Sequence, residues 1–142
     1  MANEFHQVSL KAIIRRADGR ILCLKNNKGT AFERYYDIPG GRIKKGEFKI
    51  PFIEILKREL REELGDLSLS ISDTPCALGR HWSRDGFPVI YIYFPATYEG
   101  VIDTVSTSNE HEDFAWLEVT NENIEEYFVS GILEGIRQYL NQ

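Results

Sequence analysis

The residues best suited to chemistry in this chain are three glutamates near its middle. Glu59, Glu62 and Glu63 lie in the run PFIEILKRELREELG. If that run is helical, at about 100° per residue, their carboxylates fall within an arc of about 100°. Carboxylate oxygens are usual ligands of Mg²⁺, which keeps several waters and takes the rest of its shell from phosphate oxygens. The spacing therefore indicates a divalent-cation site suited to phosphate chemistry.

The element that must position these carboxylates is a helix. Pro51 suits a first helical position, and Gly65 suits the position just past the end. The apolar residues between them recur at helical spacing: Ile53, Leu56, Leu60 and Leu64. The three acids thus border the face that the helix is expected to bury.

This crowding of acids is unfavourable for a helix standing alone. Glu59 and Glu63 are a like-charge pair four residues apart, and Glu62 and Glu63 stand in the last turn, where the helix dipole disfavours negative charge. Each effect costs about 0.3 kcal/mol or more. A bound cation would offset that cost. The alternative is a solvated acidic face with no ligand.

A family resemblance enters at this point. Eight positions follow the Nudix box, G-x5-E-x7-R-E-U-x-E-E-x-G-U with U aliphatic: Gly41, Glu47, Arg58, Glu59, Leu60, Glu62, Glu63 and Gly65. The run from Gly41 to Asp66 therefore resembles the signature of the Nudix hydrolase family. It departs from that signature twice. Ten residues rather than seven separate Glu47 from Arg58, an insertion of three before the helix, and Asp66 fills the last aliphatic position.

The resemblance implies roles for the acids. Glu59, Glu62 and Glu63 would be the catalytic carboxylates and metal ligands, with Glu59 as general base or bridging ligand. No spacing decides which acid is the base. The resemblance also makes the main-chain carbonyl of Gly40 a metal ligand, while two turn glycines without a ligand role remain the alternative.

A further acid lies near the C-terminal third. Glu110 stands six residues before Trp116, which resembles the place where many Nudix proteins carry another metal-coordinating glutamate, with Glu112 as the next choice. A solvated acidic loop is the alternative reading.

The remaining box residues have simpler expected roles. Arg58 can reach Glu54 or Glu62 on its own helix, and with Glu47 it would brace the loop against the helix. Arg42, beside the glycine turn, is a candidate phosphate contact, or else an ordinary exposed arginine. The histidines, His6, His81 and His111, are not spaced as metal ligands. One aromatic residue among Tyr35, Trp82, Phe87 and Tyr91 could stack on a base, although most strand aromatics belong to the core.

The whole chain predicts one domain over 1–142, because 142 residues are enough to bury a core. A formal charge of −5 gives no electrostatic footprint for nucleic acid or an anionic membrane. Cys23 and Cys76 have no metal-type spacing and are expected to be reduced thiols. No apolar run reaches the ~18 residues of a membrane span, and MANEFHQ lacks a signal-peptide pattern. We expect a cytoplasmic protein, a monomer or homodimer.

Local patterns predict the other elements. Asp18-Gly19 between extended runs predicts a hairpin over 8–16 and 20–25. A short strand over 35–39 should lead into a tight Gly40-Gly41 turn. Further strands are expected over 67–71, 76–82, 87–98 and 114–119. An amphipathic helix is expected over 121–140, with one apolar face formed by Ile124, Phe128, Ile132, Ile136 and Leu140. This order predicts an α/β fold of the α+β type, a mixed sheet in an α/β/α sandwich, as in Nudix proteins.

A diphosphate is a poor electrophile because its negative oxygens repel attacking water, and Mg²⁺ among the acids would neutralise that charge. The resemblance implies a magnesium-dependent pyrophosphohydrolase, with Mn²⁺ as a possible substitute, that cleaves a nucleoside diphosphate linked to another group. Sugar-nucleotides, ADP-ribose, dinucleoside polyphosphates and nucleoside triphosphates are all compatible substrates. Two alternatives stay open: a Nudix-fold module that binds or senses a nucleotide without turnover, and an interaction protein with an acidic helix.

Overall fold

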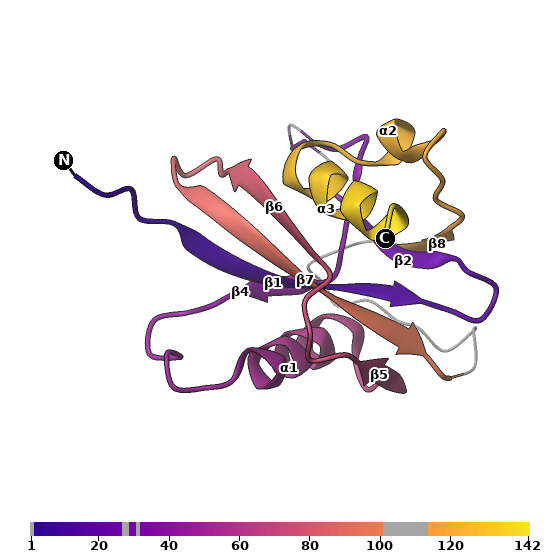
Figure 1. The fold of residues 1–142 in the computed structure, drawn as a ribbon, viewed down its shortest axis with the longest axis horizontal. Coiled ribbons are helices and arrows are strands. Elements are labelled where there is room, and N and C mark those ends of the chain that lie inside the picture. The colour runs from indigo at the N-terminus through magenta and orange to yellow at the C-terminus, as the bar shows by residue number, and fades with distance from the viewer. Residues whose placement is uncertain (1, 27–28, 31, 101–113) are drawn as a thin grey trace.

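One mixed β-sheet lies between helices on its two faces (Figure 1). The computed structural model describes residues 2–26, 29–30, 32–100 and 114–142. Its strands are β1 (Gln7–Arg15), β2 (Ile21–Lys25), β3 (Tyr36–Asp37), β4 (Gly40–Arg42), β5 (Leu69–Ile71), β6 (Ala77–Trp82), β7 (Pro88–Tyr98) and β8 (Phe114–Leu117). Its helices are α1 (Phe52–Leu64), α2 (Ile124–Tyr127) and α3 (Ser130–Leu140). The predicted fold class and the predicted hairpin are confirmed. No described helix has the length and hydropathy needed to cross a membrane.

Strand β1 organises the sheet. It runs parallel to β7 along its whole length, from Gln7 opposite Val89 to Arg15 opposite Thr97, and the other pairings are antiparallel. On its other side β1 changes partner. Its first half pairs with β4, with Lys11 opposite Gly40, whereas β2 joins only at Arg15. The strands β1 and β2 therefore diverge, and β4 lies in the gap beside the N-terminal half of β1.

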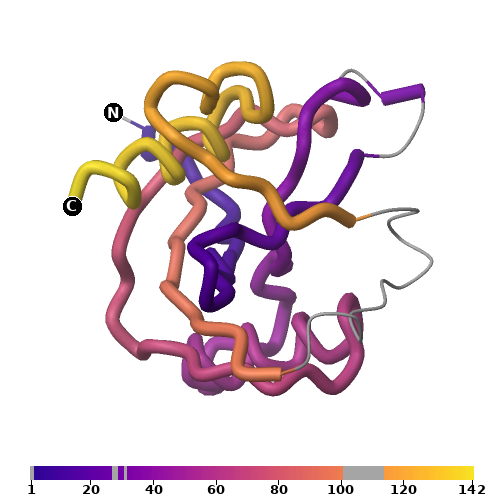
Figure 2. Tube along the Cα trace, turned by 90° about the vertical axis from the view of Figure 1, so that its right-hand side faces the viewer, coloured from indigo at the N-terminus to yellow at the C-terminus, as the bar shows by residue number. Residues whose placement is uncertain are grey.

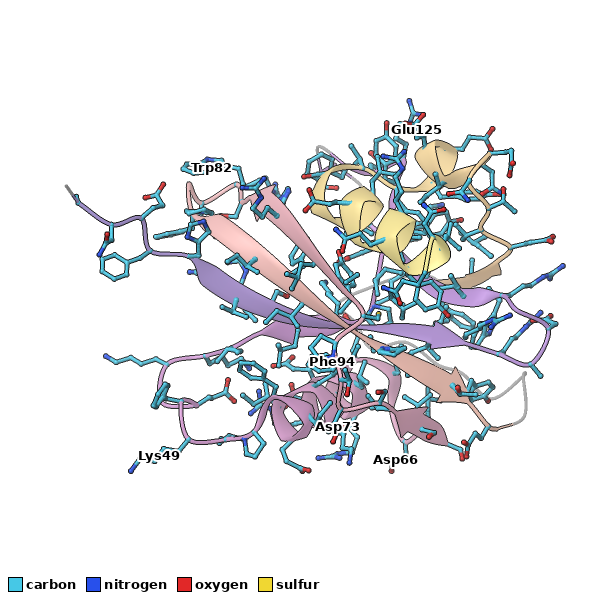
Figure 3. All side chains as sticks on the ribbon, viewed as in Figure 1. Lys49, Asp66, Asp73, Trp82, Phe94 and Glu125 are labelled. Carbon is cyan, nitrogen blue, oxygen red and sulfur yellow. The ribbon has the colours of Figure 1, made fainter. Side chains whose placement is uncertain are left out.

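The sheet buries both faces, which explains the nearly continuous apolar run of β1. Successive side chains point to opposite faces, so Ile13 and Ile14 belong to different cores. The core under α1 contains Leu56 and Leu60 with Phe94, which points toward that helix in Figure 3. The other core contains buried residues of β1, β7, α3 and the segment before α3, namely Ile13, Tyr93, Phe128, Ile132 and Ile136. Figure 2 shows α1 and α3 on opposite sides of the sheet.

The single C-terminal helix predicted over 121–140 is wrong, because the segment forms two helices. Phe128 and Val129 are extended (φ −130° and −142°), and Ser130 has a positive φ of 58°. The apolar periodicity still identified the buried residues, since Ile124 in α2 and Phe128 in the break both lie in the core. The break allows α3 to pack closely on β6, where a Cβ at Gly79 would overlap the carbonyl of Gly131. Tertiary packing here overrides the local helical pattern.

Candidate functional site

The site is built where β4 meets α1. The sequence predicted a tight turn at Gly40-Gly41, and the structure places both glycines in the short strand β4. Gly40 has φ +148°, and a Cβ there would overlap the Leu10 carbonyl oxygen. A Cβ on Gly41 would overlap the carboxyl group of Glu59. The backbone of β4 is thus approached from two sides, at Gly40 by the backbone of β1 and at Gly41 by a side chain of α1, and only glycine fits against the backbone at Gly40.

Two of the three predicted carboxylates flank this glycine pair. Glu63 is buried, with 6 % of its surface exposed, and its Oε1 accepts a hydrogen bond from the Gly40 backbone N–H at 3.0 Å. Glu59 lies against Gly41 and forms ion pairs with Arg58 Nη2 at 2.9 Å and Lys44 Nζ at 3.6 Å. The last two turns of α1 therefore bring both carboxylates to β4.

The third carboxylate lies further out. The side chain of Glu62 is 55 % exposed, and its Oε1 is 3.6 Å from Arg58 Nε. Within the described residues, no group of three acidic, histidine or cysteine side chains is arranged to hold a metal ion. The structure thus joins Glu59 and Glu63 at the glycines and places Glu62 at the edge, tied to Arg58.

The loop before α1 is anchored by Glu47. This side chain is buried, accepts a hydrogen bond from the Lys44 backbone N–H at 2.6 Å and pairs with Arg58. The pKa of Glu47 lies below its usual value, chiefly because of the hydrogen bond from Arg58 and secondly because of that from the Lys44 N–H. The hydrogen bond to Glu47 in turn raises the pKa of Arg58. The insertion falls in the segment after Glu47, where Phe48 is 96 % exposed. The extra residues therefore extend a surface turn and leave the contact between Glu47 and Arg58 in place.

A cleft of about 650 Å³ opens beside the glycines, within the size range of small-molecule sites. Gly40, Gly41 and Glu63 line one part of it. Arg42 also lines the cleft, and its Nη1 donates a hydrogen bond to Gln7 Oε1 at 2.6 Å. Arg84 adds a second guanidinium to the lining. This part of the cleft combines acidic oxygens with cations that suit phosphate oxygens.

Sequence reasoning missed two residues in this cleft, Lys11 and Asp37. Lys11 is 7 % exposed, and its Nζ donates hydrogen bonds to Asp37 Oδ1 at 3.2 Å and to the Ile38 carbonyl at 3.0 Å. Burial by itself would lower the pKa of Lys11, but attraction to Asp37, Tyr91 and Glu63 outweighs it and the pKa is raised. The available signal was a single charge inside the apolar strand VSLKAII.

The other predicted site residues fall in different places. Glu110 and Glu112 lie outside the described residues. Of the aromatic candidates for base stacking, Tyr91 lines the cleft, whereas Trp82 and Phe87 are largely exposed. Trp82 projects from the end of β6 in Figure 3.

The donor set at β4 fits a hard divalent cation in kind. It offers the carboxylate oxygens of Glu59 and Glu63 beside the backbone of β4, and the exposed carboxylate of Glu62 next to Glu63 in the chain. These are all oxygen ligands, which Mg²⁺ and Mn²⁺ prefer, and no sulfur or imidazole is among them. Glu59 and Glu62 are held by cationic side chains, which a metal ion would replace.

Comparison with known proteins agrees with this fold. The family model described as NUDIX domain matches residues 5–130. The fold is similar to a MutT protein from Methanosarcina mazei Go1, at TM-score 0.68 and 22% identity, covering 99% of this chain and 94% of that one. It is also similar to an Ap4A hydrolase from C. elegans, at TM-score 0.73 and 20% identity, covering 94% of each chain.

A curated relative shares part of the sequence. Subunit 5 of the cleavage and polyadenylation specificity factor of Dictyostelium discoideum is 34% identical over 80 residues, which are 54% of this chain and 36% of that protein. The chain thus spans about a third of that relative's length. The family match covers most of the chain, including the whole run from Gly41 to Asp66. This chain therefore belongs to the Nudix family.

Proposed function

We propose that this protein is a magnesium-dependent pyrophosphohydrolase acting on a nucleoside diphosphate linked to another group. The observation that carries the proposal is the placement of Glu59 and Glu63 against Gly40 and Gly41 at the side of a cleft that also holds Arg42. Candidate substrates are sugar-nucleotides, ADP-ribose, dinucleoside polyphosphates and nucleoside triphosphates. Family membership supports the reaction class.

Glu59, Glu62, Glu63 and the Gly40 carbonyl would hold the metal. When bound, Mg²⁺ supplies charge neutralisation of the diphosphate and lowers the pKa of a coordinated water. Glu59 accepts the proton of the attacking water, since it lies beside the glycines with its carboxyl group at Gly41. Arg42 orients the phosphate oxygens by its planar guanidinium. Water attacks phosphorus, the phosphoanhydride bond breaks, and the products are a nucleoside monophosphate and the phosphorylated second group.

The decisive variant is Glu62→Gln, which removes the charge of a proposed metal ligand and keeps the shape of an exposed side chain. The side chain of Glu62 is 55 % exposed and its ion pair with Arg58 is long, at 3.6 Å, so the variant should fold normally and lose nearly all turnover. Phosphate release would be measured across a nucleotide panel with Mg²⁺ and with Mn²⁺. Glu54→Gln is the matched control, the same change on an exposed residue of the same helix. Full activity in Glu62→Gln would remove the claim.

A second candidate is a Nudix-fold module that binds a nucleotide or partner without cleaving it. It is favoured by the ion pairs that Arg58 and Lys44 form with Glu59 and by the similarity to a protein named for cleavage and polyadenylation rather than for hydrolysis. Magnesium-dependent turnover of any nucleotide in the panel would argue against it.

A further inference from the structure

The cleft continues into a smaller side pocket of about 170 Å³. It lies between β3, β6, β7 and the start of α3, and its walls include Phe32, Tyr36, His81 and Tyr91. His81 stacks on Tyr91 with ring centroids 6.0 Å apart and planes at 15°, and Phe32 meets His81 edge-on at 5.6 Å. Aromatic walls around a small volume suit a planar ring, because every base offers a π-face.

The far wall of this pocket is polar and strained. Ser130 Oγ lies 2.9 Å from His81 Nδ1, and burial lowers the pKa of His81, so its ring is neutral near pH 7. Ser130 has φ 58°, a conformation that is unfavourable for a residue with a side chain. Residues held in such conformations cluster at ligand sites.

A buried ion pair stands where the side pocket meets the main cleft. Asp37 lines both spaces, whereas Lys11 lines the main cleft. The Lys11 ammonium carries three N–H donors. Two of them reach Asp37 and the Ile38 carbonyl, and the charge lies 5.5 Å from the centre of the Tyr91 ring. Among the described residues the third donor forms no hydrogen bond, and we assign it to a ligand in the cleft.

We propose that this region is a nucleoside subsite in which the side pocket holds the base and the pair of Lys11 and Asp37 binds the ribose hydroxyls. The ribose is the group that joins base and phosphate, and the pair lies between the aromatic walls and the glycines of β4. A hydroxyl both donates and accepts hydrogen bonds, which matches a carboxylate beside an ammonium. The site therefore selects ribonucleoside over 2′-deoxyribonucleoside diphosphate derivatives. The placement of the diphosphate at Gly40 rests on the proposed function.

Binding without turnover tests the subsite directly. The probes are AMP, GMP, CMP and UMP, their 2′-deoxy counterparts and ribose 5-phosphate, titrated calorimetrically into the full chain in the presence of EDTA. We expect at least one ribonucleotide to bind about tenfold or more tightly than its deoxy form, because one hydrogen bond to a charged group is lost. Ribose 5-phosphate should bind more weakly than that ribonucleotide because it has no base.

Two variants separate the roles. Lys11→Met should bring the ribo and deoxy affinities together, whereas Tyr91→Leu should weaken both and keep their ratio. A purely structural role of Lys11 would not change that ratio. The double variant Lys11→Met/Asp37→Asn removes both charges together, which avoids leaving a buried charge alone, and it should also lose the preference. Trp82→Leu changes an exposed side chain that lines neither space and should bind like the wild type.

Several results would overturn the proposal: equal ribo and deoxy affinities in the wild type, an unchanged ratio in Lys11→Met, or no binding of any monophosphate at millimolar concentration. The outcome is independent of the hydrolase proposal. Magnesium-dependent turnover without a ribose preference would support the hydrolase proposal and contradict the subsite proposal. A ribose preference without turnover would do the reverse.

Discussion

Arg58 is the side chain that connects the acids of the candidate site. It pairs with Glu47 in the loop and with Glu59 and Glu62 on its own helix. One cation thus shares its charge among three carboxylates, which offsets part of the repulsion expected from their spacing. A divalent ion at Glu59 and Glu62 would take over that role, leaving Arg58 to hold Glu47.

The two glycines of β4 provide a matched pair of variants. In Gly41→Ala the new methyl group meets the end of the flexible Glu59 side chain, so the fold should survive while Glu59 is displaced. In Gly40→Ala the methyl group meets the backbone of β1 at a positive φ, which costs about 1–3 kcal/mol in conformational strain alone. Thermal melts with and without millimolar Mg²⁺ check this. Gly41→Ala should keep its Tm and lose the rise with Mg²⁺, and Gly40→Ala should melt lower in both. Equal behaviour of the two variants would contradict the close approach of α1 to β4.

Acid should weaken the anchor of the loop. The pKa of Glu47 is lowered from its ordinary value of 4.5, first by the hydrogen bond from Arg58. A depressed folded-state pKa means that the ionised form stabilises the fold, so this contribution is complete above the unfolded pKa and is lost as pH falls through the folded value. Melts of the wild type and Glu47→Gln between pH 7 and pH 3 should differ at neutral pH and converge in acid. A constant difference over that range would show that the charge of Glu47 is not the cause.

At the scale of elements, α1 is held by its apolar face. Its buried residues pack against β1 and β7. This packing sets the position of the helix relative to β4, and with it the position of the glutamate side chains. Leu56 is fully buried at the centre of that face. The position of the carboxylates therefore depends on side chains that carry no chemistry themselves.

Leu56→Ala should lower the free energy of unfolding by about 2–5 kcal/mol, because it removes buried methyl groups and leaves a cavity. Lys57→Ala, the neighbouring exposed position, should change it by less than about 0.5 kcal/mol. Urea denaturation would measure the free energy of unfolding of both variants, and an unchanged dependence on urea concentration would show that only stability has changed. A loss of similar size in the two variants would contradict the packing of α1 described above.

At the scale of the whole molecule, the charge balance is acidic. The formal charge is −5 and the sequence pI is about 5.2. Binding to the phosphate backbone of a nucleic acid is driven by counterion release from clustered lysine and arginine, and an acidic molecule opposes it. The single-domain organisation over 1–142 and the cytoplasmic location stay predictions.

We expect no measurable binding of a single-stranded RNA oligonucleotide at physiological salt, despite the partial similarity to a protein named for cleavage and polyadenylation. Fluorescence anisotropy with labelled RNA, repeated at low salt, would measure this. Binding at micromolar affinity that weakens steeply with salt would show a basic surface that the net charge conceals.

The sequence by itself determined α1, its glutamates and the hairpin of β1 and β2, because helical spacing, terminal residues and an Asp-Gly turn act over a few neighbouring residues. It also identified Ile124 and Phe128 as core residues, since burial follows periodicity even where the backbone does not.

Only the tertiary structure decided how those pieces meet. It placed Glu59 and Glu63 against the glycines of β4 and left Glu62 exposed beside Arg58, because only part of this helix face packs against β4. It also broke the C-terminal helix before Ser130 and paired Lys11 with Asp37, 26 residues apart. These outcomes depend on contacts between segments that are distant in the chain, and no local pattern records such contacts.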